Sequence, residues 1–180
     1  MVNKGLFLDR DGVINIDHGY VHKVQDFDFV SGIFDLTRDA VNKGYMIFVI
    51  TNQAGIGRGF YSISDFNLLT DWMCSKFFSK GITVSKVYYC PYHPTHGKAG
   101  YKQDHAFRKP NPGMINQAVE EFHVDLTQSI LIGDKLTDIQ AGKNAGVGTN
   151  ILYLGNGTVK PVSSQADYSV SSLHDAKLLI

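Results

Sequence analysis

The stretch Phe7-Leu8-Asp9-Arg10-Asp11-Gly12-Val13 places two carboxylates directly after a short apolar run, residues 5–8. A continuous apolar run of this length is typical of a strand that is buried on both faces. Gly12 then allows the chain to turn. Of two acids one residue apart, the first can attack phosphorus and the second can protonate the leaving group. Acid pairs are also common in ordinary turns, so the meaning of this pair depends on the rest of the chain.

The composition predicts one domain that spans residues 1–180. The chain has 43% apolar residues, with 17 basic and 17 acidic residues. A net charge of zero gives no field that would attract nucleic acid or a membrane, so we expect neither as a partner. The two cysteines, Cys74 and Cys90, do not suggest a disulfide framework. We see no signal peptide and no apolar span of roughly 20 residues, and we therefore expect a soluble, cytoplasmic protein.

Apolar runs alternate with helical patterns along the chain. The runs predicted as strands are residues 6–8, 46–50, 84–89, 129–132 and 149–153. The segments predicted as helices are residues 32–43, 64–79, 111–122 and 136–145. Ser62 and Asp65 have the spacing of a capping box that opens the second helix. The alternation predicts an α/β fold with a doubly wound, mostly parallel sheet, whose ligands bind beyond the carboxyl ends of the strands.

Two connections, residues 15–30 and 91–107, are longer than a compact fold needs. Long loops in small domains are usually functional or disordered. Both leave the edge of the sheet that should carry the site, so we interpret them as walls of a pocket. Neither is long enough to fold as a separate cap domain. Asn156-Gly157-Thr158 matches a glycosylation sequon, which we interpret as a turn.

The second predicted strand ends in Thr51-Asn52-Gln53. A hydroxyl at a strand end, followed by exposed backbone amides, can hold phosphoryl oxygens, although a capped turn has the same appearance. Three glycines between residues 55 and 59 suggest a dinucleotide-binding loop. That interpretation fails because position 60 is Phe60 and because we expect no helix to open directly at this turn.

Arg108-Lys109-Pro110 comes just before a predicted helix. Proline keeps the preceding residue extended, which would present Lys109 at the edge of the sheet, where an ammonium can neutralise a transferring phosphate. The surrounding segment is basic, with one acid, Asp104, against the four cations Lys98, Lys102, Arg108 and Lys109. In a neutral protein this excess indicates an anionic substrate, such as one with a second phosphate.

A fourth segment, Ile130-Leu131-Ile132-Gly133-Asp134-Lys135, delivers a third carboxylate at the end of an apolar strand. Hard oxygen ligands with no Cys or His predict Mg²⁺. Asp138 follows in the first turn of the next helix, where a favourable charge at a helix N-terminus explains it at least as well as catalysis.

Asp9-Arg10-Asp11-Gly12-Val13, Thr51, Lys109 and Gly133-Asp134, in this order, resemble the four motifs of the haloacid dehalogenase (HAD) superfamily of phosphatases. Within that superfamily the chain is similar, over nearly its whole length, to the D-glycero-D-manno-heptose 1,7-bisphosphate 7-phosphatases. The segments that carry this similarity are Asp17-His18-Gly19-Tyr20-Val21, Thr51-Asn52-Gln53-Ala54-Gly55-Ile56-Gly57-Arg58-Gly59, Cys90-Pro91, Arg108-Lys109-Pro110 and Gly133-Asp134-Lys135.

The resemblance implies a HAD-like Rossmannoid fold and a two-step, Mg²⁺-dependent hydrolysis of the sugar 7-phosphate. Asp9 would form an aspartyl-phosphate, and Asp11 would protonate the leaving oxygen and later activate water. The metal would be held by Asp9, Asp134 and the backbone carbonyl of Asp11, while Thr51 and Lys109 would stabilise the transferring group. The residues expected to bind substrate are Asp17, His18, Gly19, Tyr20, Thr51, Asn52, Gln53, Ala54, Arg108, Lys109 and Lys135.

The chain departs from this family at the zinc-binding loop, which typically has a Cys-x-His pair followed by a Cys-x-Cys pair. The corresponding positions here are Cys90, Tyr92, His105 and Phe107. Neither Tyr nor Phe is a normal zinc ligand, so we expect the loop to fold without zinc. The alternative is a rearranged set of ligands, namely Cys90, His93, His96 and His105.

Other functions remain open at this stage. A histidinol-phosphate phosphatase, or a phosphatase of another small metabolite, is the enzymatic alternative, and the basic loop favours a doubly anionic substrate over it. A signalling receiver domain has its phosphorylated Asp on a later strand than the acid pair, unlike Asp9 and Asp11. A phosphosugar-binding module without activity is disfavoured because all four motif residues are present. We expect a monomer that takes part in heptose precursor synthesis for lipopolysaccharide or capsule.

Overall fold

The protein has one six-stranded sheet in which all neighbouring strands pair in parallel, in the order β3-β2-β1-β4-β5-β6. The computed structural model describes residues 2–155 and 165–180. The strands are β1 (Lys4–Leu8), β2 (Tyr45–Asn52), β3 (Val84–Cys90), β4 (Ile130–Gly133), β5 (Thr149–Tyr153) and β6 (Tyr168–Val170). The five predicted strands and the parallel, doubly wound sheet are thus confirmed, with small changes at the strand ends.

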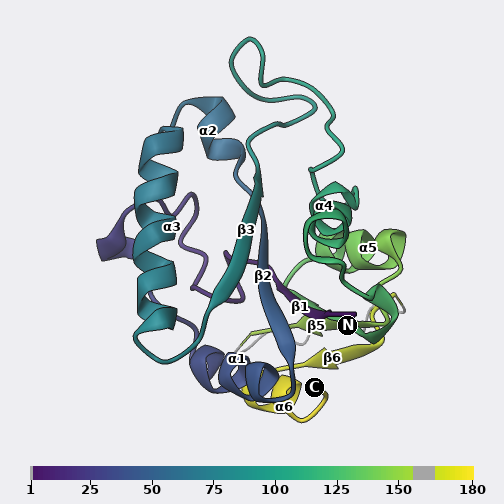
Figure 1. The fold of residues 1–180 in the computed structure, drawn as a ribbon. Helices are drawn as coiled ribbons and strands as arrows, with labels where there is room; N and C mark the ends of the chain where they lie inside the picture. Colours follow the sequence, from purple (N-terminus) through teal and green to yellow (C-terminus); the bar gives the residue numbers. More distant parts are fainter. Residues whose placement is uncertain (1, 156–164) are drawn as a thin grey trace.

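Helices cover both faces of the sheet (Figure 1). They are α1 (Ile33–Asn42), α2 (Ala54–Arg58), α3 (Ile63–Phe78), α4 (Gly113–Phe122), α5 (Leu136–Ala145) and α6 (Leu173–Lys177), with the short 3-10 helices Val24–Asp26 and Leu126–Gln128. One buried cluster joins the sheet to α1, α3 and α6, and a second joins its other face to α4 and α5.

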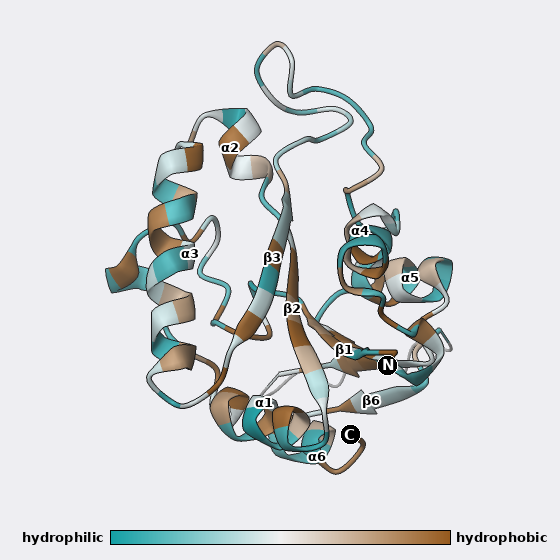
Figure 2. Ribbon diagram, in the orientation of Figure 1, coloured by the Kyte–Doolittle hydropathy of each residue, from teal (hydrophilic) through white to brown (hydrophobic). Residues whose placement is uncertain are grey.

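Successive residues of the central strands point into different cores, as a pleated strand requires. In β1, Leu6 and Leu8 belong to the first cluster and Phe7 to the second. This is why the central strands are apolar on both sides, as their hydropathy shows (Figure 2). The sheet is therefore rigid where its carboxyl ends present side chains.

The four predicted helices form, and the capping box is present at the start of α3. Ser62 Oγ accepts from the Asp65 amide at 3.1 Å, and Asp65 Oδ2 accepts from the Ser62 amide at 2.8 Å. The expectation that no helix opens after Gln53 was wrong, because α2 begins at Ala54. It is a five-residue helix with two internal glycines, too short for an amphipathic pattern to reveal. The structure also adds β6 and α6, which are equally short.

The connection after β3 extends beyond the sheet (Figure 1) and contains no helix or strand of its own in residues 91–112. The described residues show no separate cap domain. None of their helices has the length and apolar composition that a membrane span requires. Both cysteines are free. The turn expected at 156–158 lies outside the described residues.

Candidate active site

The carboxyl ends of three neighbouring strands bring the predicted catalytic residues together. Asp9 follows β1, Thr51 lies near the end of β2, and Asp134 follows β4. Lys109 reaches the same point from the loop after β3, and its Nζ lies 2.8 Å from Asp9 Oδ1. The Lys109 ammonium also donates to the Ile50 carbonyl at 2.9 Å. Residues far apart in the sequence thus converge on one carboxylate.

Lys109 is buried, with 3% of the residue exposed. Burial disfavours its charge, but the carboxylates of Asp138 and Asp9 outweigh burial and raise the pKa of Lys109. The pKa of Asp9 is raised well above its usual range by burial and by repulsion from Asp138 and Asp134, which Lys109 offsets in part. Carboxylates are therefore more numerous than the buried cation can neutralise.

This excess of negative charge fits a divalent cation. Asp9, Asp134 and Asp138 each have an oxygen within 4.8 Å of the others. Asp134 Oδ1 is buried and has no hydrogen-bond partner among the described residues. Hard, anionic oxygen ligands are those that Mg²⁺ prefers. Asp9 and Asp134 thus satisfy the chemical requirements of the magnesium site that the sequence predicted.

Asp138 is the site residue to which sequence reasoning gave too little weight. It is 1% exposed, and its Oδ1 lies 2.7 Å from Lys109 Nζ. Its Oδ2 accepts from the Lys135 amide at 2.9 Å, so it also caps α5 as expected. A Cβ on Gly133 would lie 2.2 Å from Asp138 Cβ, and glycine at this position lets the helix approach the strand end.

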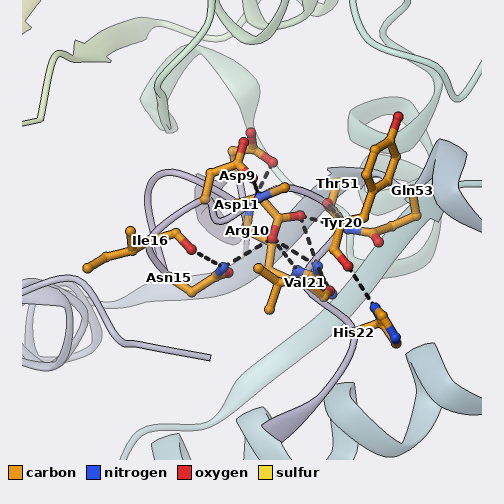
Figure 3. Close-up of polar contacts among 12 residues, drawn as sticks. Asp9, Arg10, Asp11, Asn15, Ile16, Tyr20, Val21, His22, Thr51 and Gln53 are labelled. Carbon is orange, nitrogen blue, oxygen red and sulfur yellow. Dashed lines mark hydrogen bonds and ion pairs between the residues drawn. The ribbon is translucent and has the colours of Figure 1, made fainter. Parts of the chain in front are cut away.

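The carboxylate of Asp11 is held by three side chains, those of Arg10, Asn15 and Gln53 (Figure 3). Arg10 Nη2 donates to both of its oxygens at 2.9 Å, Asn15 Nδ2 donates to Oδ1 at 3.1 Å, and Gln53 Nε2 donates to Oδ2 at 2.9 Å. Arg10 is 1% exposed and also donates to the Val21 carbonyl at 2.7 Å. One buried guanidinium therefore connects Asp11 to the loop of residues 15–30.

Gln53 connects Asp11, after β1, to Thr51, near the end of β2. Its Nε2 donates to Thr51 Oγ1 at 2.8 Å as well as to Asp11, and its Oε1 accepts from the Tyr61 hydroxyl at 2.5 Å. The Tyr61 ring stacks on His22, with centroids 4.9 Å apart. Gln53 is 2% exposed, which together with these bonds leaves its amide little freedom. Neither Arg10 nor Tyr61 was predicted as a site residue, since only the fold shows their partners.

A cavity of about 250 Å³ lies beside Asp11 and contains most of the predicted substrate-binding residues. Its walls are Asp11, Asp17, Gly19, Tyr20, Asn52, Gln53, Ala54, Tyr61, Arg108 and Lys135. A smaller cavity of about 50 Å³, which Asp9, Thr51, Lys109 and Asp138 line, shares three wall residues with it. A phosphorylated molecule could thus place its phosphate at Asp9 and the rest of its body in the larger cavity.

Three predicted substrate residues have other contacts as well. His18 turns out of the larger cavity, and its Nε2 lies 2.9 Å from Asp28 Oδ2. Asn52 exchanges two 3.1 Å hydrogen bonds with the Lys109 backbone. Lys135 Nζ lies 3.2 Å from Asp17 Oδ2. Burial disfavours the Lys135 ammonium, but the carboxylates of Asp134, Asp9 and Asp17 outweigh it and raise the pKa of Lys135.

The loop after β3 is held by ring contacts among its own residues. Among the described residues, the group of at least three His, Cys, Asp or Glu side chains that could share an ion is the carboxylate cluster alone. The rearranged set of Cys90, His93, His96 and His105 is not brought together in that way. The Tyr92 ring instead stacks on His105, with centroids 4.5 Å apart, and the Phe107 ring packs edge-on against His105, with centroids 5.5 Å apart.

The fold is that of haloacid dehalogenase-like phosphatases, and the HAD-hydrolase-like family model matches residues 106–176. A D-glycero-alpha-D-manno-heptose-1,7-bisphosphate 7-phosphatase of Burkholderia mallei is 55% identical over 84% of this chain and 80% of its own. The beta enzyme of Haemophilus influenzae is 44% identical over 97% of this chain and 95% of its own. The chain belongs to the family of D-glycero-D-manno-heptose-1,7-bisphosphate 7-phosphatases, as the resemblance of its motifs implied.

A solved structure supports the same conclusion. The D,D-heptose 1,7-bisphosphate phosphatase of B. bronchiseptica, complexed with magnesium and phosphate, has a TM-score of 0.82 and 27% identity to this chain. The match covers 98% of this chain and 97% of that protein. The phosphatase fold therefore extends over nearly the whole chain.

Proposed function

We propose that the protein removes the 7-phosphate of D-glycero-D-manno-heptose 1,7-bisphosphate by Mg²⁺-dependent hydrolysis. The observation that carries this proposal is the contact of Lys109 Nζ with Asp9 Oδ1 at 2.8 Å, in the smaller cavity, which shares wall residues with the larger one. The similarity to heptose bisphosphate phosphatases supports the identity of the sugar, and the arrangement of Asp9 and Lys109 supports the hydrolytic chemistry. The product would be a heptose 1-phosphate for the synthesis of lipopolysaccharide or capsule precursors.

Asp9 is the proposed nucleophile. Lys109 pairs with Oδ1 of this carboxylate, so Oδ2 would form the new bond to phosphorus while the bond from phosphorus to the sugar oxygen breaks. Lys109 would hold Asp9 Oδ1 and neutralise the charge of the transferring group. The Thr51 hydroxyl, near the end of β2, would bind a phosphoryl oxygen. The result of this step is an aspartyl-phosphate and a free heptose 1-phosphate.

Magnesium, when bound, supplies positive charge that stabilises the phosphoryl oxygens in the transition state. Asp9, Asp134 and the backbone carbonyl of Asp11 are the proposed ligands. Asp138, paired with Lys109 at 2.7 Å, adds negative charge beside them. Removal of the Asp134 carboxylate should therefore weaken metal binding without a change in the nucleophile.

Asp11 is the proposed general acid and base. As a carboxylic acid it would give its proton to the departing sugar oxygen, and as a carboxylate it would then take a proton from the water that attacks the aspartyl-phosphate. This second step releases inorganic phosphate and restores both side chains. Arg10, Asn15 and Gln53 would keep Asp11 close to the reacting oxygens in both states.

The sugar would lie in the larger cavity. Arg108 and Lys135 would provide positive charge, and Asp17, Gly19, Tyr20, Asn52, Gln53 and Ala54 would contact hydroxyl groups, with His18 at the outer rim. We further propose that the enzyme acts as a monomer in the cytoplasm. The excess of cations near this cavity favours a bisphosphate over histidinol phosphate.

A phosphate-release screen tests this function. Wild-type protein is incubated with both anomers of heptose 1,7-bisphosphate, with sugar monophosphates and with histidinol phosphate, each with and without Mg²⁺. We expect rapid Mg²⁺-dependent release from a heptose bisphosphate and none from Asp9→Asn. Asp35→Asn on α1, which is exposed, is the matched control. Comparable rates on all substrates would remove the heptose assignment, and no turnover at all would favour a binding module.

A further inference from the structure

We propose that the stacked rings of Tyr92 and His105 take the place of a metal in the loop after β3, and that they position Arg108 against the sugar. The proposal rests on the proposed function and deepens it, because it names the device behind one specificity residue. The two ring planes are 19° apart and their centroids 4.5 Å apart. Tyr101 and Phe107 extend the cluster, with ring centroids 5.7 Å from Tyr92 and 5.5 Å from His105.

Both stacked residues hold Arg108 through their backbones. Arg108 Nη1 donates to the Tyr92 carbonyl at 2.9 Å, and the Arg108 amide donates to the His105 carbonyl at 2.9 Å. The stack fixes these two carbonyls relative to one another, although they are 13 positions apart in the sequence. The guanidinium and the backbone of Arg108 are therefore both fixed by one pair of rings, at the wall of the larger cavity.

The loop is also attached to the rest of the protein close to the stack. The Lys98 amide donates to the Gly57 carbonyl at 2.7 Å. A Cβ on Gly57 would lie 2.5 Å from the Pro91 carbonyl and 2.8 Å from Tyr101 Cβ, so α2 and the loop touch backbone to backbone. The rings thus act between two fixed points, α2 on one side and Arg108 on the other.

The chemistry of the neighbouring groups suits rings and does not suit zinc. The Phe107 amide donates to His105 Nδ1 at 3.1 Å, which places the proton of a neutral ring on Nε2. Cys90 is buried, and burial raises the pKa of its thiol. Zinc binds the thiolate. In this structure the Cys90 thiol donates to the Tyr92 carbonyl, with Sγ 3.9 Å from the oxygen. Two of the four positions, Tyr92 and Phe107, therefore lack a normal zinc ligand atom.

A pair of substitutions at one position separates a ring from a ligand. His105→Phe keeps an aromatic face and removes the two ring nitrogens. His105→Ala removes the aromatic face as well as the nitrogens. We expect His105→Ala to raise KM for heptose bisphosphate by about 3- to 10-fold, the value of an aromatic pair, with kcat little changed. His105→Phe should restore most of this KM. His96→Ala, in an exposed part of the same loop, is the matched control.

Two further measurements test the route through Arg108. In a double-mutant cycle, Tyr92→Ala should add nothing to the KM of Arg108→Ala, because the stack acts through that guanidinium. On p-nitrophenyl phosphate, which has no sugar, His105→Ala and wild type should have similar kcat/KM. Additive effects in the cycle, or an equal loss on both substrates, would overturn the positioning role.

Metal analysis of the purified wild-type chain completes the test. We expect far less than one zinc per chain. One zinc per chain, together with His105→Phe as impaired as His105→Ala, would show that the histidine is a ligand. If His105→Ala does not fold, the comparison of His105→Phe with wild type decides between a ring and a ligand. If the wild type releases no phosphate from heptose bisphosphate, the proposed function fails, while the metal content and the melting temperatures of the variants still test the ring stack.

Discussion

Two regions of the molecule line the proposed substrate site, and they are built in opposite ways. The carboxyl edge of the sheet has buried charges, and the Lys109 ammonium forms ion pairs with both Asp9 and Asp138. The loop after β3 has half-buried rings and backbone hydrogen bonds around Arg108. The first region is tied to strands that are apolar on both faces, whereas the second is tied to α2. The comparison indicates that the reaction depends on the sheet and that the choice of substrate depends on the loops.

The comparison would break most visibly at Lys109. Lys109→Ala removes the ammonium that lies 2.8 Å from Asp9 Oδ1. We expect kcat to fall by about 10²- to 10³-fold. Because Asp9 and Asp138 would then be buried without their partner, the metal-free protein should lose about 3–5 kcal/mol of unfolding free energy. Steady-state kinetics and urea titration measure the two effects. Lys86→Ala, with a 4.0 Å surface pair, is the control and should change neither.

Substitution of Arg10 tests whether turnover depends on the hydrogen bonds that Arg10 donates to Asp11. Arg10→Met retains an apolar stem but removes the donors to Asp11 and to the Val21 carbonyl, and we expect a loss of about 10- to 100-fold in kcat, the cost of a misplaced group. KM should rise less than kcat falls. Arg38→Met on the exposed face of α1 is the control. A variant with normal kcat would show that Asp11 is held well enough by Asn15 and Gln53.

Magnesium sharpens the contrast at the level of stability. The metal should relieve the repulsion among Asp9, Asp134 and Asp138 and stabilise the fold by about 2.7 kcal/mol at 100 times its Kd. For a chain of this size that is a rise of about 5 to 10 °C in Tm, measured by scanning calorimetry with Mg²⁺ and with EDTA. Asp134→Asn should lose most of the rise. A rise of the same size in Asp134→Asn would place the metal elsewhere.

The smallest effect is expected at the junction of the two regions, where Lys135 meets Asp17. The Gly19 amide and Lys135 outweigh partial burial and lower the pKa of Asp17. A lowered carboxyl pKa stabilises the folded state above the ordinary value of 3.8, and this stability is lost as the pH falls through the folded value. The pair is half exposed, so Asp17→Asn should cost less than about 1 kcal/mol at pH 7 and less again at an acidic pH below 3.8. Urea titrations at the two pH values measure the difference.

Much of the sheet and of its chemistry could be predicted from the sequence. Continuous apolar runs identify the central strands, and a polar side chain at the end of each run then lies at the shared carboxyl edge. The positions of Asp9, Thr51 and Asp134 follow from this rule, and that of Lys109 from the proline after it, whereas the roles of all four came from the order of the motifs and the resemblance that they carry. The contact of Lys109 with Asp9 needed the structure only for its distance.

The rest could not be predicted because its signals are short or depend on the fold. Asp138 has the sequence pattern of a helix cap, and only the position of Lys109 shows its second role. The five-residue helix α2 gives no period to detect. The stack of Tyr92 on His105 joins residues on the two sides of a loop with no regular structure, so no local pattern indicates it. Sequence reasoning noted Tyr92 and Phe107 at two of the family's zinc-ligand positions, but it could not show the ring contacts that these residues make with His105.

The guanidinium of Arg10 has a consequence for how this pocket can change. It binds the carboxylate that would deliver the proton and, at 2.7 Å, the main chain of the loop that would touch the sugar. A shift of that loop to accept a larger or smaller substrate would therefore drag the proton donor with it. New specificity acquired through residues 15–30 should come with slower turnover, whereas changes around Arg108 leave the donor untouched. Adaptation of this enzyme to other sugars would then begin on the far wall.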